Sequence, residues 1–209
     1  MRITIARHAQ TAYNAALRMQ GHMAHTPLTR SGIAQAERMG KALGADPNMS
    51  AADYDIWSSP SGRTLQTAAI IAEHLGRDFF GIRTDARLLE IDIGTWEGRL
   101  YSDVIAETGP IMCPDRGVFT ARPPGGEWYP AIADRLRRWI ADLDPERNVL
   151  VISHGVTLRV LRGLLAGGEE FEGVRIADNA PQGTIFRIED GVQSIVHLGD
   201  GSGNMMVVV

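Results

Sequence analysis

Residues 2–14 read Arg-Ile-Thr-Ile-Ala-Arg-His-Ala-Gln-Thr-Ala-Tyr-Asn, and this stretch decides how the rest of the chain is interpreted. Ile3 and Ile5 alternate with polar residues, which is the spacing of a β-strand. Arg7 and His8 stand side by side where this strand is expected to end. Arginine matches the geometry of a phosphate group, and an unprotonated histidine nitrogen can attack phosphorus. Because ligands bind beyond the carboxyl ends of strands in an open α/β sheet, the pair predicts a phosphate site with its own nucleophile.

Two further predicted strands end in residues of the same kinds. Taken alone, the first pair is explained more simply as a strand-end arginine and a histidine packed in a loop. However, a strand predicted at residues 54–58 runs into Arg63, and the unbroken apolar run at residues 148–153, typical of a buried parallel strand, ends at His154. In a parallel sheet these ends share one rim, which brings two arginines and two histidines around one crevice. Two guanidinium groups can neutralise a phosphoryl group without a metal ion.

Helical periodicity between the strands predicts the layers of the fold. The predicted helices cover residues 12–17, 30–43, 63–75, 128–143 and 156–165, and a further strand is predicted at residues 80–84. Asp190-Gly191, between apolar runs at 184–189 and 192–198, indicates a hairpin. The pattern predicts an α/β fold, a three-layer α/β/α sandwich with a mostly parallel sheet and an antiparallel edge hairpin. Residues 109–127 hold four prolines and are predicted to be a long loop, functional or mobile.

Composition limits the classes of protein to which the chain can belong. Its 209 residues fit one domain, residues 1–209, and 44% hydrophobic and 22% charged residues are ordinary for a globular protein. A formal net charge of −4 gives no basic stripe for nucleic acid. The single cysteine, Cys113, favours a reducing compartment, and no apolar run approaches the ~18 residues of a membrane span. We expect a cytoplasmic protein without nucleic-acid or membrane partners, and the sequence leaves a homodimer open.

Six motifs together resemble those of one family. Arg7-His8-Ala9-Gln10-Thr11 with Asn14 resembles the signature of the histidine phosphatase superfamily, also called the phosphoglycerate mutase-like family. Five more motifs follow in the family's order: residues 27–29 with Gly32, residues 58–60 with Arg63, Leu89-Glu90 with the tract 94–98, residues 125–127, and residues 151–155. Each motif is weak alone, but six in order, over most of the chain, are specific. The resemblance implies a phosphoglycerate mutase-like fold.

The resemblance also implies a role for each site residue. His8 would be the nucleophile that becomes phosphohistidine, and Glu90 would protonate the leaving oxygen and then activate water. The phosphoryl oxygens would be held by Arg7, Arg63 and His154. Asn14 would add a hydrogen bond, and Gln20 and Gly21 would approach the substrate. Glu97 is the rival to Glu90 as the acid, and the family pattern favours Glu90.

No metal or cofactor is expected. His22 and His25 could form a metal site with His8, but no metal-binding motif supports it, and solvated loop histidines are the simpler interpretation. The predicted function is therefore a metal-independent phosphomonoester hydrolase acting on a small phosphorylated substrate.

Two other functions stay open. One is phosphoglycerate mutase-type phosphoryl transfer, although the tract Gly-Thr-Trp-Glu-Gly at residues 94–98 resembles the phosphatase branch. The other is a catalytically silent protein that binds a phosphorylated ligand, which the intact set of site residues argues against. The substrate cannot be named from the sequence, and its specificity is expected to lie in residues 99–128, where the resemblance is weakest.

Overall fold

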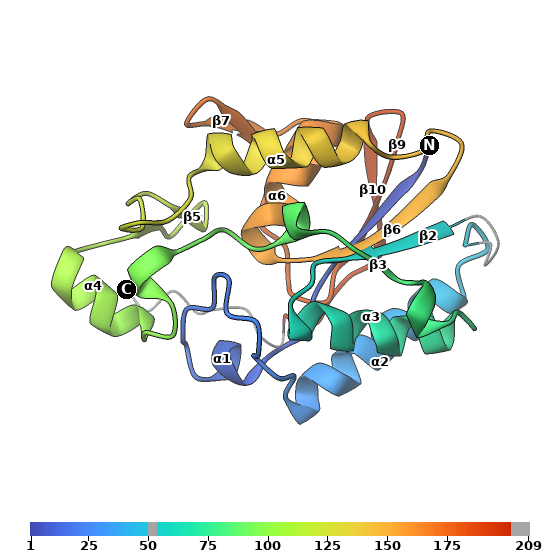
Figure 1. Ribbon diagram of the computed structural model, residues 1–209, viewed down its shortest axis with the longest axis horizontal. Coiled ribbons are helices and arrows are strands. Elements are labelled where there is room, and N and C mark those ends of the chain that lie inside the picture. Colours follow the sequence, from blue (N-terminus) through green and yellow to red (C-terminus); the bar gives the residue numbers. More distant parts are fainter. Residues whose placement is uncertain (50–53, 202–209) are drawn as a thin grey trace.

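A mixed six-stranded sheet runs through the middle of the molecule in the order β10-β9-β1-β6-β2-β3 (Figure 1). The computed structural model describes residues 1–49 and 54–201. Four neighbouring strands are parallel: β1 (Ile3–Arg7), β6 (Asn148–Ser153), β2 (Tyr54–Ser58) and β3 (Arg83–Thr84). The hairpin of β9 (Ile185–Glu189) and β10 (Val192–His197) adds an antiparallel edge. The predicted α/β fold is confirmed.

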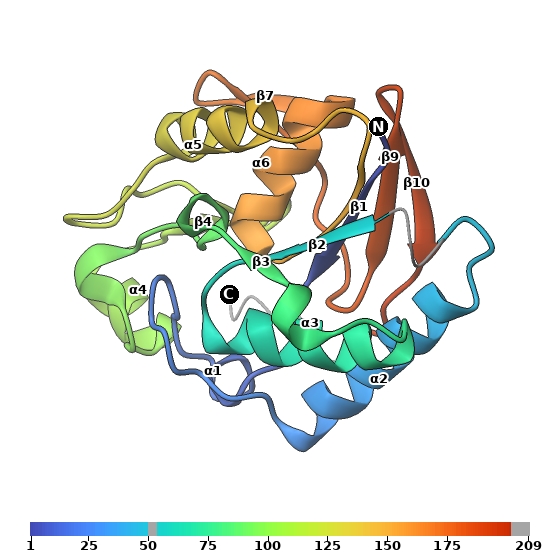
Figure 2. The same cartoon turned by 45° about the vertical axis from the view of Figure 1, so that its right-hand side comes forward.

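Helices cover both faces of this sheet (Figures 1 and 2). One face carries α2 (Arg30–Gly44) and α3 (Gly62–His74), and the other carries α5 (Tyr129–Ala141) and α6 (Gly155–Ala166). Strand β6 shows why its sequence is apolar throughout. Val149 and Val151 pack into the core under α5 and α6, whereas Leu150 and Ile152 pack into the core over α2 and α3. A strand buried on both faces cannot alternate with polar residues.

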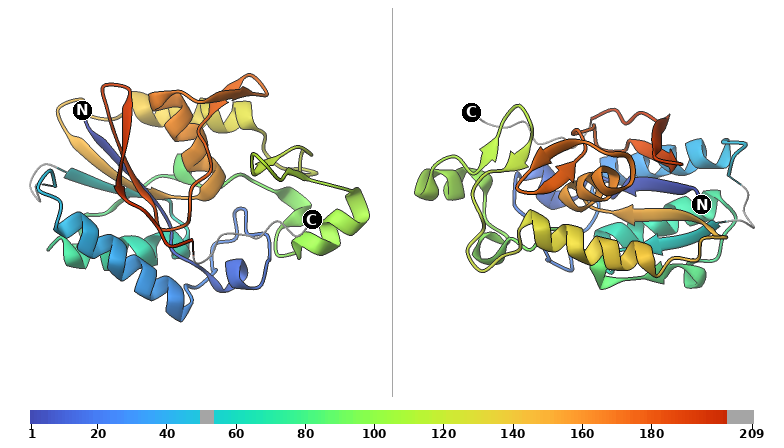
Figure 3. Two further views of the ribbon diagram at one scale, coloured as in Figure 1. Left: turned by 180° about the vertical axis from the view of Figure 1, so that it is seen from behind. Right: turned by 90° about the horizontal axis from the view of Figure 1, so that it is seen from above.

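The edge hairpin forms at the turn that its sequence predicts, and Figure 3 shows it from behind. Asp190 and Gly191 have φ values of 49° and 77°. Positive φ at both central residues is the geometry of a type I′ turn, whose twist matches that of the flanking strands.

The expected strand at residues 80–84 is wrong in its first half. Phe79–Gly81 forms a 3₁₀ helix, η1, and only Arg83–Thr84 pairs with the sheet. Asp78 caps this turn by accepting a hydrogen bond from the Phe80 backbone N–H, and the Phe80 side chain is 90% exposed. Ile82 packs against the core, whereas Phe79 and Phe80 are exposed, so the local cap at Asp78 outweighs the β-propensity of the two phenylalanines.

Several short elements have no counterpart among the predictions. The expected long loop contains the two-residue strands β4 (Met112–Cys113) and β5 (Val118–Phe119), preceded by helix α4 (Tyr101–Thr108). The small hairpin of β7 (Glu169–Phe171) and β8 (Val174–Ile176) follows α6.

The helix predicted at residues 12–17 is shorter in the structure. Helix α1 spans Ala12–Ala15, because the chain turns to positive φ at Leu17.

Segment 98–119 lies against the loop that follows β1, beside α1 in Figure 1. The Met19 N–H donates to the Arg99 carbonyl over 2.9 Å, and the Tyr101 N–H donates to the Leu17 carbonyl over 3.1 Å. These bonds hold the start of α4 near the carboxyl ends of the parallel strands, whereas the β4–β5 hairpin is held by Arg159, whose guanidinium donates to the carbonyls of Arg116 and Gly117. Within residues 1–49 and 54–201, no helix is long and apolar enough to cross a membrane.

We predict that Leu150→Ala lowers the free energy of unfolding by about 2–5 kcal/mol, because the side chain is fully buried between strand and helices. Urea unfolding measures this loss. Val192→Ala, at an exposed position of β10, is the control and should change the free energy by less than about 0.5 kcal/mol. Equal losses in the two variants would contradict the core described here.

Candidate active site

The hydrogen bonds between the parallel strands continue past the strand ends and assemble the site. The His8 N–H donates to the Ser153 carbonyl over 2.9 Å, and the Ser59 N–H donates to the Ile152 carbonyl over 3.0 Å. The rings of His8 and His154 consequently face each other edge to face, with their centroids 5.3 Å apart. The structure thus brings together the ends of β1, β2 and β6, as the sequence predicts.

The backbone fixes which nitrogen of His8 carries the proton. His8 Nδ1 lies 2.8 Å from the Ala9 carbonyl oxygen, and a carbonyl can only accept. Nδ1 is therefore the protonated nitrogen, and Nε2 of the neutral ring holds a free lone pair. Ala9 does not have the positive φ that only glycine adopts easily, so an alanine fits at this position.

The surroundings of His8 keep its ring neutral. Only 2% of the residue is exposed, and burial is the largest cause that lowers its pKa well below 6.5. The positive charges of Arg63 and Arg7 act in the same direction. At neutral pH the imidazole is consequently in the form that can attack phosphorus.

Arg63 is held by the loop in front of it and by His154 behind it. Its Nε donates to His154 Nδ1 over 3.1 Å, and Nη2 donates to the Gly21 carbonyl over 2.8 Å. Nη1 donates to the Met23 carbonyl and to Thr26 Oγ1 over 2.8 and 3.1 Å. Burial lowers the pKa of Arg63 to about 10, which leaves the guanidinium charged at neutral pH.

His154 has both ring nitrogens engaged. Because Nδ1 accepts from Arg63, Nε2 carries the proton and donates to Ser59 Oγ over 2.8 Å. Burial, followed by the charge of Arg63, lowers the pKa of His154 well below 6.5. In this arrangement His154 orients Arg63 and is itself oriented by Ser59.

Arg7 and two glycines complete the charged end of the site. Arg7 Nε is buried, and no residue within 1–49 or 54–201 forms a hydrogen bond with it. A Cβ added to Gly155 would lie 3.3 Å from Arg7 Cζ, so the guanidinium packs flat on the first turn of α6. Gly21 has a φ of 48°, and a Cβ there would lie 2.5 Å from the Ile93 side chain. The loop carbonyl that Arg63 binds is therefore available only with glycine at this position.

Glu90 caps the helix that follows His154. Its Oε1 accepts from the backbone N–H groups of Ile91 and Thr157 over 3.0 and 3.1 Å, and its Oε2 accepts from that of Val156 over 3.3 Å. The N-cap residue of α6, His154, makes no capping bond with its own side chain. Glu90 thus satisfies helix N–H groups that an N-cap side chain usually binds.

Glu97, the rival candidate for the acid, points elsewhere. Its carboxylate accepts from the backbone N–H of His22, and it is not among the residues that line the cavity beside His8.

Asn14 and Gln20 are joined through Thr11. Asn14 Oδ1 accepts from the Thr11 backbone N–H over 3.1 Å, and the Thr11 backbone and side chain form a capping box with Asn14. Thr11 Oγ1 lies 2.9 Å from Gln20 Oε1. The cap of α1 therefore fixes both side chains in the wall of the site.

These residues surround a cavity of about 160 Å³. Of the predicted site residues, seven line it: Arg7, His8, Asn14, Gln20, Gly21, Arg63 and Glu90. His154 is the exception, because it lies behind Arg63 and lines a smaller adjoining cavity.

Other lining residues were not predicted as site residues from the sequence, among them Tyr101, Met112, Phe119, Arg18, Arg159 and Asn179. The first three belong to the segment in which specificity was expected. Burial, followed by the charge of Glu90, raises the pKa of Tyr101 to about 12. Arg159 could have been noticed as one of two arginines, with Arg162, in the mostly apolar helix pattern of α6. Across the part of the chain that the structure describes, no group of three or more His, Cys, Asp or Glu side chains could hold a metal ion.

Comparison with known proteins agrees with this geometry. Residues 3–201 match the family model described as histidine phosphatase superfamily (branch 1). The chain is 33% identical to the probable phosphoglycerate mutase GpmB of Salmonella paratyphi C over 171 residues, which are 80% of this chain and 75% of that protein.

Solved structures resemble the chain over nearly its whole length. The α-ribazole phosphatase of Shigella flexneri superposes with a TM-score of 0.71 and 27% identity, covering 96% of this chain and 97% of that one. A mycobacterial glucosyl-3-phosphoglycerate phosphatase, at 24% identity and a TM-score of 0.74, covers 95% of this chain and 98% of its own and supports the fold alone. The chain belongs to branch 1 of the histidine phosphatase superfamily.

Proposed function

We propose that the protein hydrolyses a phosphomonoester through a phosphohistidine on His8, without a metal ion. The observation that carries this proposal is a buried imidazole with a free Nε2 lone pair between two guanidinium groups. The charges of Arg7 and Arg63 supply the stabilisation that a metal ion provides in other phosphoryl transferases.

The proposed reaction has two steps. His8 Nε2 forms a bond to phosphorus while the bond to the ester oxygen breaks, and Glu90 donates a proton to that oxygen. Water then attacks the phosphohistidine, Glu90 takes the proton back, and the N–P bond breaks to release phosphate and restore His8. Both steps use groups that line one cavity.

Arg7 and Arg63 are proposed to contact the phosphoryl group directly, whereas His154 is proposed to act mainly through Arg63. Arg7 and Arg63 line the cavity and would bind phosphoryl oxygens. His154 would bind one only if its Nε2–H left Ser59 Oγ, and otherwise it acts by orienting Arg63. Asn14, Gln20 and Gly21 would contact the substrate from the loop side.

Phosphoglycerate mutase-type transfer is the second candidate, because a relative of 33% identity bears that name. A phosphoglycerate carries a carboxylate besides its phosphate. Away from Arg7 and Arg63, the cavity wall includes the uncharged side chains of Tyr101, Met112 and Phe119. The guanidinium of Arg159 in the same wall is bonded to three backbone carbonyls. Arg18 lies in the same wall, and its guanidinium donates from Nη1 to the Gly98 carbonyl, so it is the cation that would pair with such a carboxylate.

Supplying 3-phosphoglycerate separates the two functions. A mutase would form 2-phosphoglycerate faster than it releases inorganic phosphate. A phosphatase would either release inorganic phosphate from 3-phosphoglycerate or leave the 3-phosphoglycerate unchanged. A panel of phosphorylated metabolites, read by phosphate release, would then identify the substrate.

We predict that His8→Ala abolishes turnover of p-nitrophenyl phosphate in EDTA and keeps the fold, because the nucleophile is lost. Quenching the wild type during turnover should trap a phosphoenzyme that is labile in acid and stable in base, and the variant should trap none. Near-wild-type activity of His8→Ala would exclude the covalent mechanism. Loss of wild-type activity in EDTA, restored by added metal, would exclude the metal-free one.

We predict that stability falls as the pH drops below about 6.5, the usual histidine pKa. His8 and His154 have lowered pKa values in the folded chain, so below that pH the unfolded chain binds more protons. Each buried histidine should contribute a slope approaching about 1.4 kcal/mol per pH unit. Urea unfolding between pH 5 and 7.5 measures it, and His8→Gln should show a shallower decline. Identical slopes in wild type and variant would mean that His8 is not held neutral by the fold.

We predict that Glu90→Gln slows phosphorylation of His8 far more with an alkyl phosphate than with p-nitrophenyl phosphate. An alkyl leaving oxygen needs a proton, whereas p-nitrophenolate hardly does, and general acid catalysis is worth roughly 10²–10⁴-fold. Rapid-quench measurement of phosphoenzyme formation isolates this step from the hydrolysis that Glu90 also assists. Glu97→Gln is the matched control. Equal slowing with both substrates, or a selective loss in Glu97→Gln instead, would reject Glu90 as the acid.

A further inference from the structure

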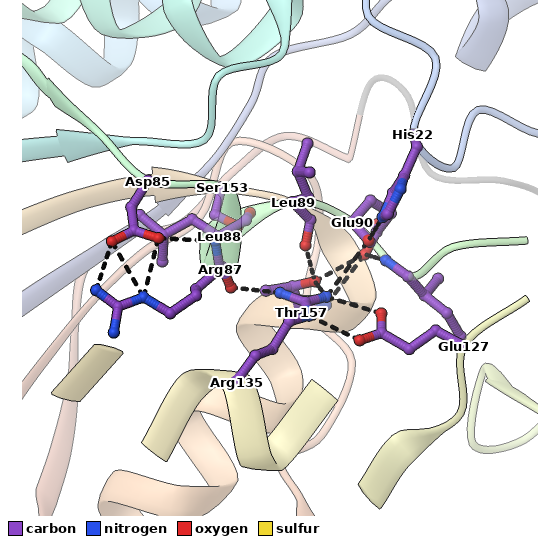
Figure 4. A network of polar contacts seen from close by, with 11 residues as sticks. His22, Asp85, Arg87, Leu88, Leu89, Glu90, Glu127, Arg135, Ser153 and Thr157 are labelled. Carbon is purple, nitrogen blue, oxygen red and sulfur yellow. Dashed lines mark hydrogen bonds and ion pairs between the residues drawn. The ribbon is translucent and has the colours of Figure 1, made fainter. Parts of the chain in front are cut away.

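An ion pair between α5 and the loop before it lies behind the proposed acid (Figure 4). Arg135 Nε is 2.8 Å from Glu127 Oε1, and Nη2 is 3.0 Å from Oε2. The two side chains are only 11% and 15% exposed. A two-point pair of this kind fixes the plane of the guanidinium, so its remaining N–H groups have fixed directions.

Those remaining N–H groups reach the main chain around Glu90. Nη1 of Arg135 donates to the Arg87 carbonyl. The N–H of Nη2 that Glu127 leaves free is shared between the Glu90 carbonyl, over 3.3 Å, and Thr157 Oγ1, over 3.2 Å. Thr157 Oγ1 also lies 2.7 Å from the Leu89 carbonyl and 3.3 Å from Glu90 Oε1. One guanidinium thus holds the peptide of Glu90 and the hydroxyl beside its carboxylate.

The Glu90 carbonyl is also held from the opposite side. His22, in the loop after β1, donates to it from Nε2 over 2.9 Å (Figure 4). The carboxylate itself accepts three backbone N–H groups, described above. Main chain and side chain of Glu90 are therefore both fixed, the main chain by Arg135 and His22 and the side chain by the start of α6.

We propose that Arg135, locked by Glu127, is a positioning residue that holds Glu90 where it transfers protons. The inference rests on the proposed role of Glu90 as the general acid. Arg135 is not among the residues that line the cavity, so it acts through Glu90 and Thr157. Proton transfer needs donor and acceptor within about 2.6–3.2 Å, so a small displacement of Glu90 slows the step that it serves.

Arg135→Lys tests the proposal while keeping the positive charge beside Glu127. A lysine has one nitrogen and cannot bind Glu127, the Arg87 carbonyl and the Glu90 carbonyl as the guanidinium does. Rapid-quench phosphorylation of His8 should slow by about tenfold or more with an alkyl phosphate and by less than about threefold with p-nitrophenyl phosphate. Arg137→Lys, in an exposed ion pair with Asp134 on the same helix, is the matched control and should leave both rates unchanged.

Two further measurements separate positioning from a structural role. In the Glu90→Gln background, Arg135→Lys should add less than about a twofold effect, because residues that act as a unit are not additive. The dissociation constant of inorganic phosphate, measured by calorimetry, should stay within about twofold, because Arg7 and Arg63 are untouched. Equal slowing of both substrates, a full effect in the Glu90→Gln background, or weakened phosphate binding would each overturn the positioning role.

The kinetics of Glu90→Gln distinguish a failure of the proposed function from a failure of the positioning role. If Glu90→Gln itself slows both substrates equally, the acid assignment fails, and the positioning role fails with it. If Glu90→Gln is selective and Arg135→Lys is not, only the positioning role fails. Should Arg135→Lys not fold, Glu127→Gln replaces it, since the amide keeps the volume and removes the charge that locks Arg135. Glu127→Gln should likewise slow phosphorylation of His8 more with the alkyl phosphate than with p-nitrophenyl phosphate. Equal slowing with the two substrates, or no slowing, would overturn the proposal.

Discussion

The hydrogen bond from the His8 N–H to the Ser153 carbonyl sets the geometry of the site. It extends the parallel pairing of β1 and β6 by one residue, so the residues that follow both strands stay in register. His8 and His154 consequently meet, and Arg63 reaches His154 from the start of α3. A slip of one residue in this pairing would turn every side chain of β1 to the other face of the sheet. The proposed nucleophile and its partners would then lie in different layers.

Burial and positive charge act together on the two histidines. Each of these conditions disfavours an imidazolium, and both lower the pKa of His8 and His154. The guanidinium groups of Arg7 and Arg63 would also attract a phosphate dianion. Among the described residues neither group forms an ion pair with a carboxylate, so the phosphate would neutralise their positive charge. Arg63 meanwhile binds loop carbonyls, and Arg7 Nε has no hydrogen-bond partner among the residues that the structure describes. The site is organised around a negative charge that the substrate brings.

Local signals made much of this molecule predictable from its sequence. The apolar run of β6, the Asp190-Gly191 turn and the Arg7-His8 pair each lie within a few residues, and the family motifs indicated Glu90. The contacts that fix Glu90 could not be predicted, because Thr157 and Arg135 lie 67 and 45 residues away along the chain. The wall around Tyr101 could not be predicted either, because the start of α4 is bonded to the loop after β1 and the β4–β5 hairpin is bonded to Arg159 of α6, both far away along the chain. The expected strand at residues 80–84 failed for the opposite reason, since a local turn outweighed β-propensity.

The cap that Glu90 provides to α6 has a consequence for how this chain can diverge. Catalytic groups commonly make the fold that holds them less stable. Glu90 departs from this tendency, because losing its carboxylate deprives amides at the start of α6 of their acceptor. Replacements that keep a side-chain acceptor, such as glutamine, can therefore remove the proposed acid and keep a cap, whereas an apolar residue at this position would remove both. The ways in which this position can lose its proposed chemistry are thus limited by the start of α6.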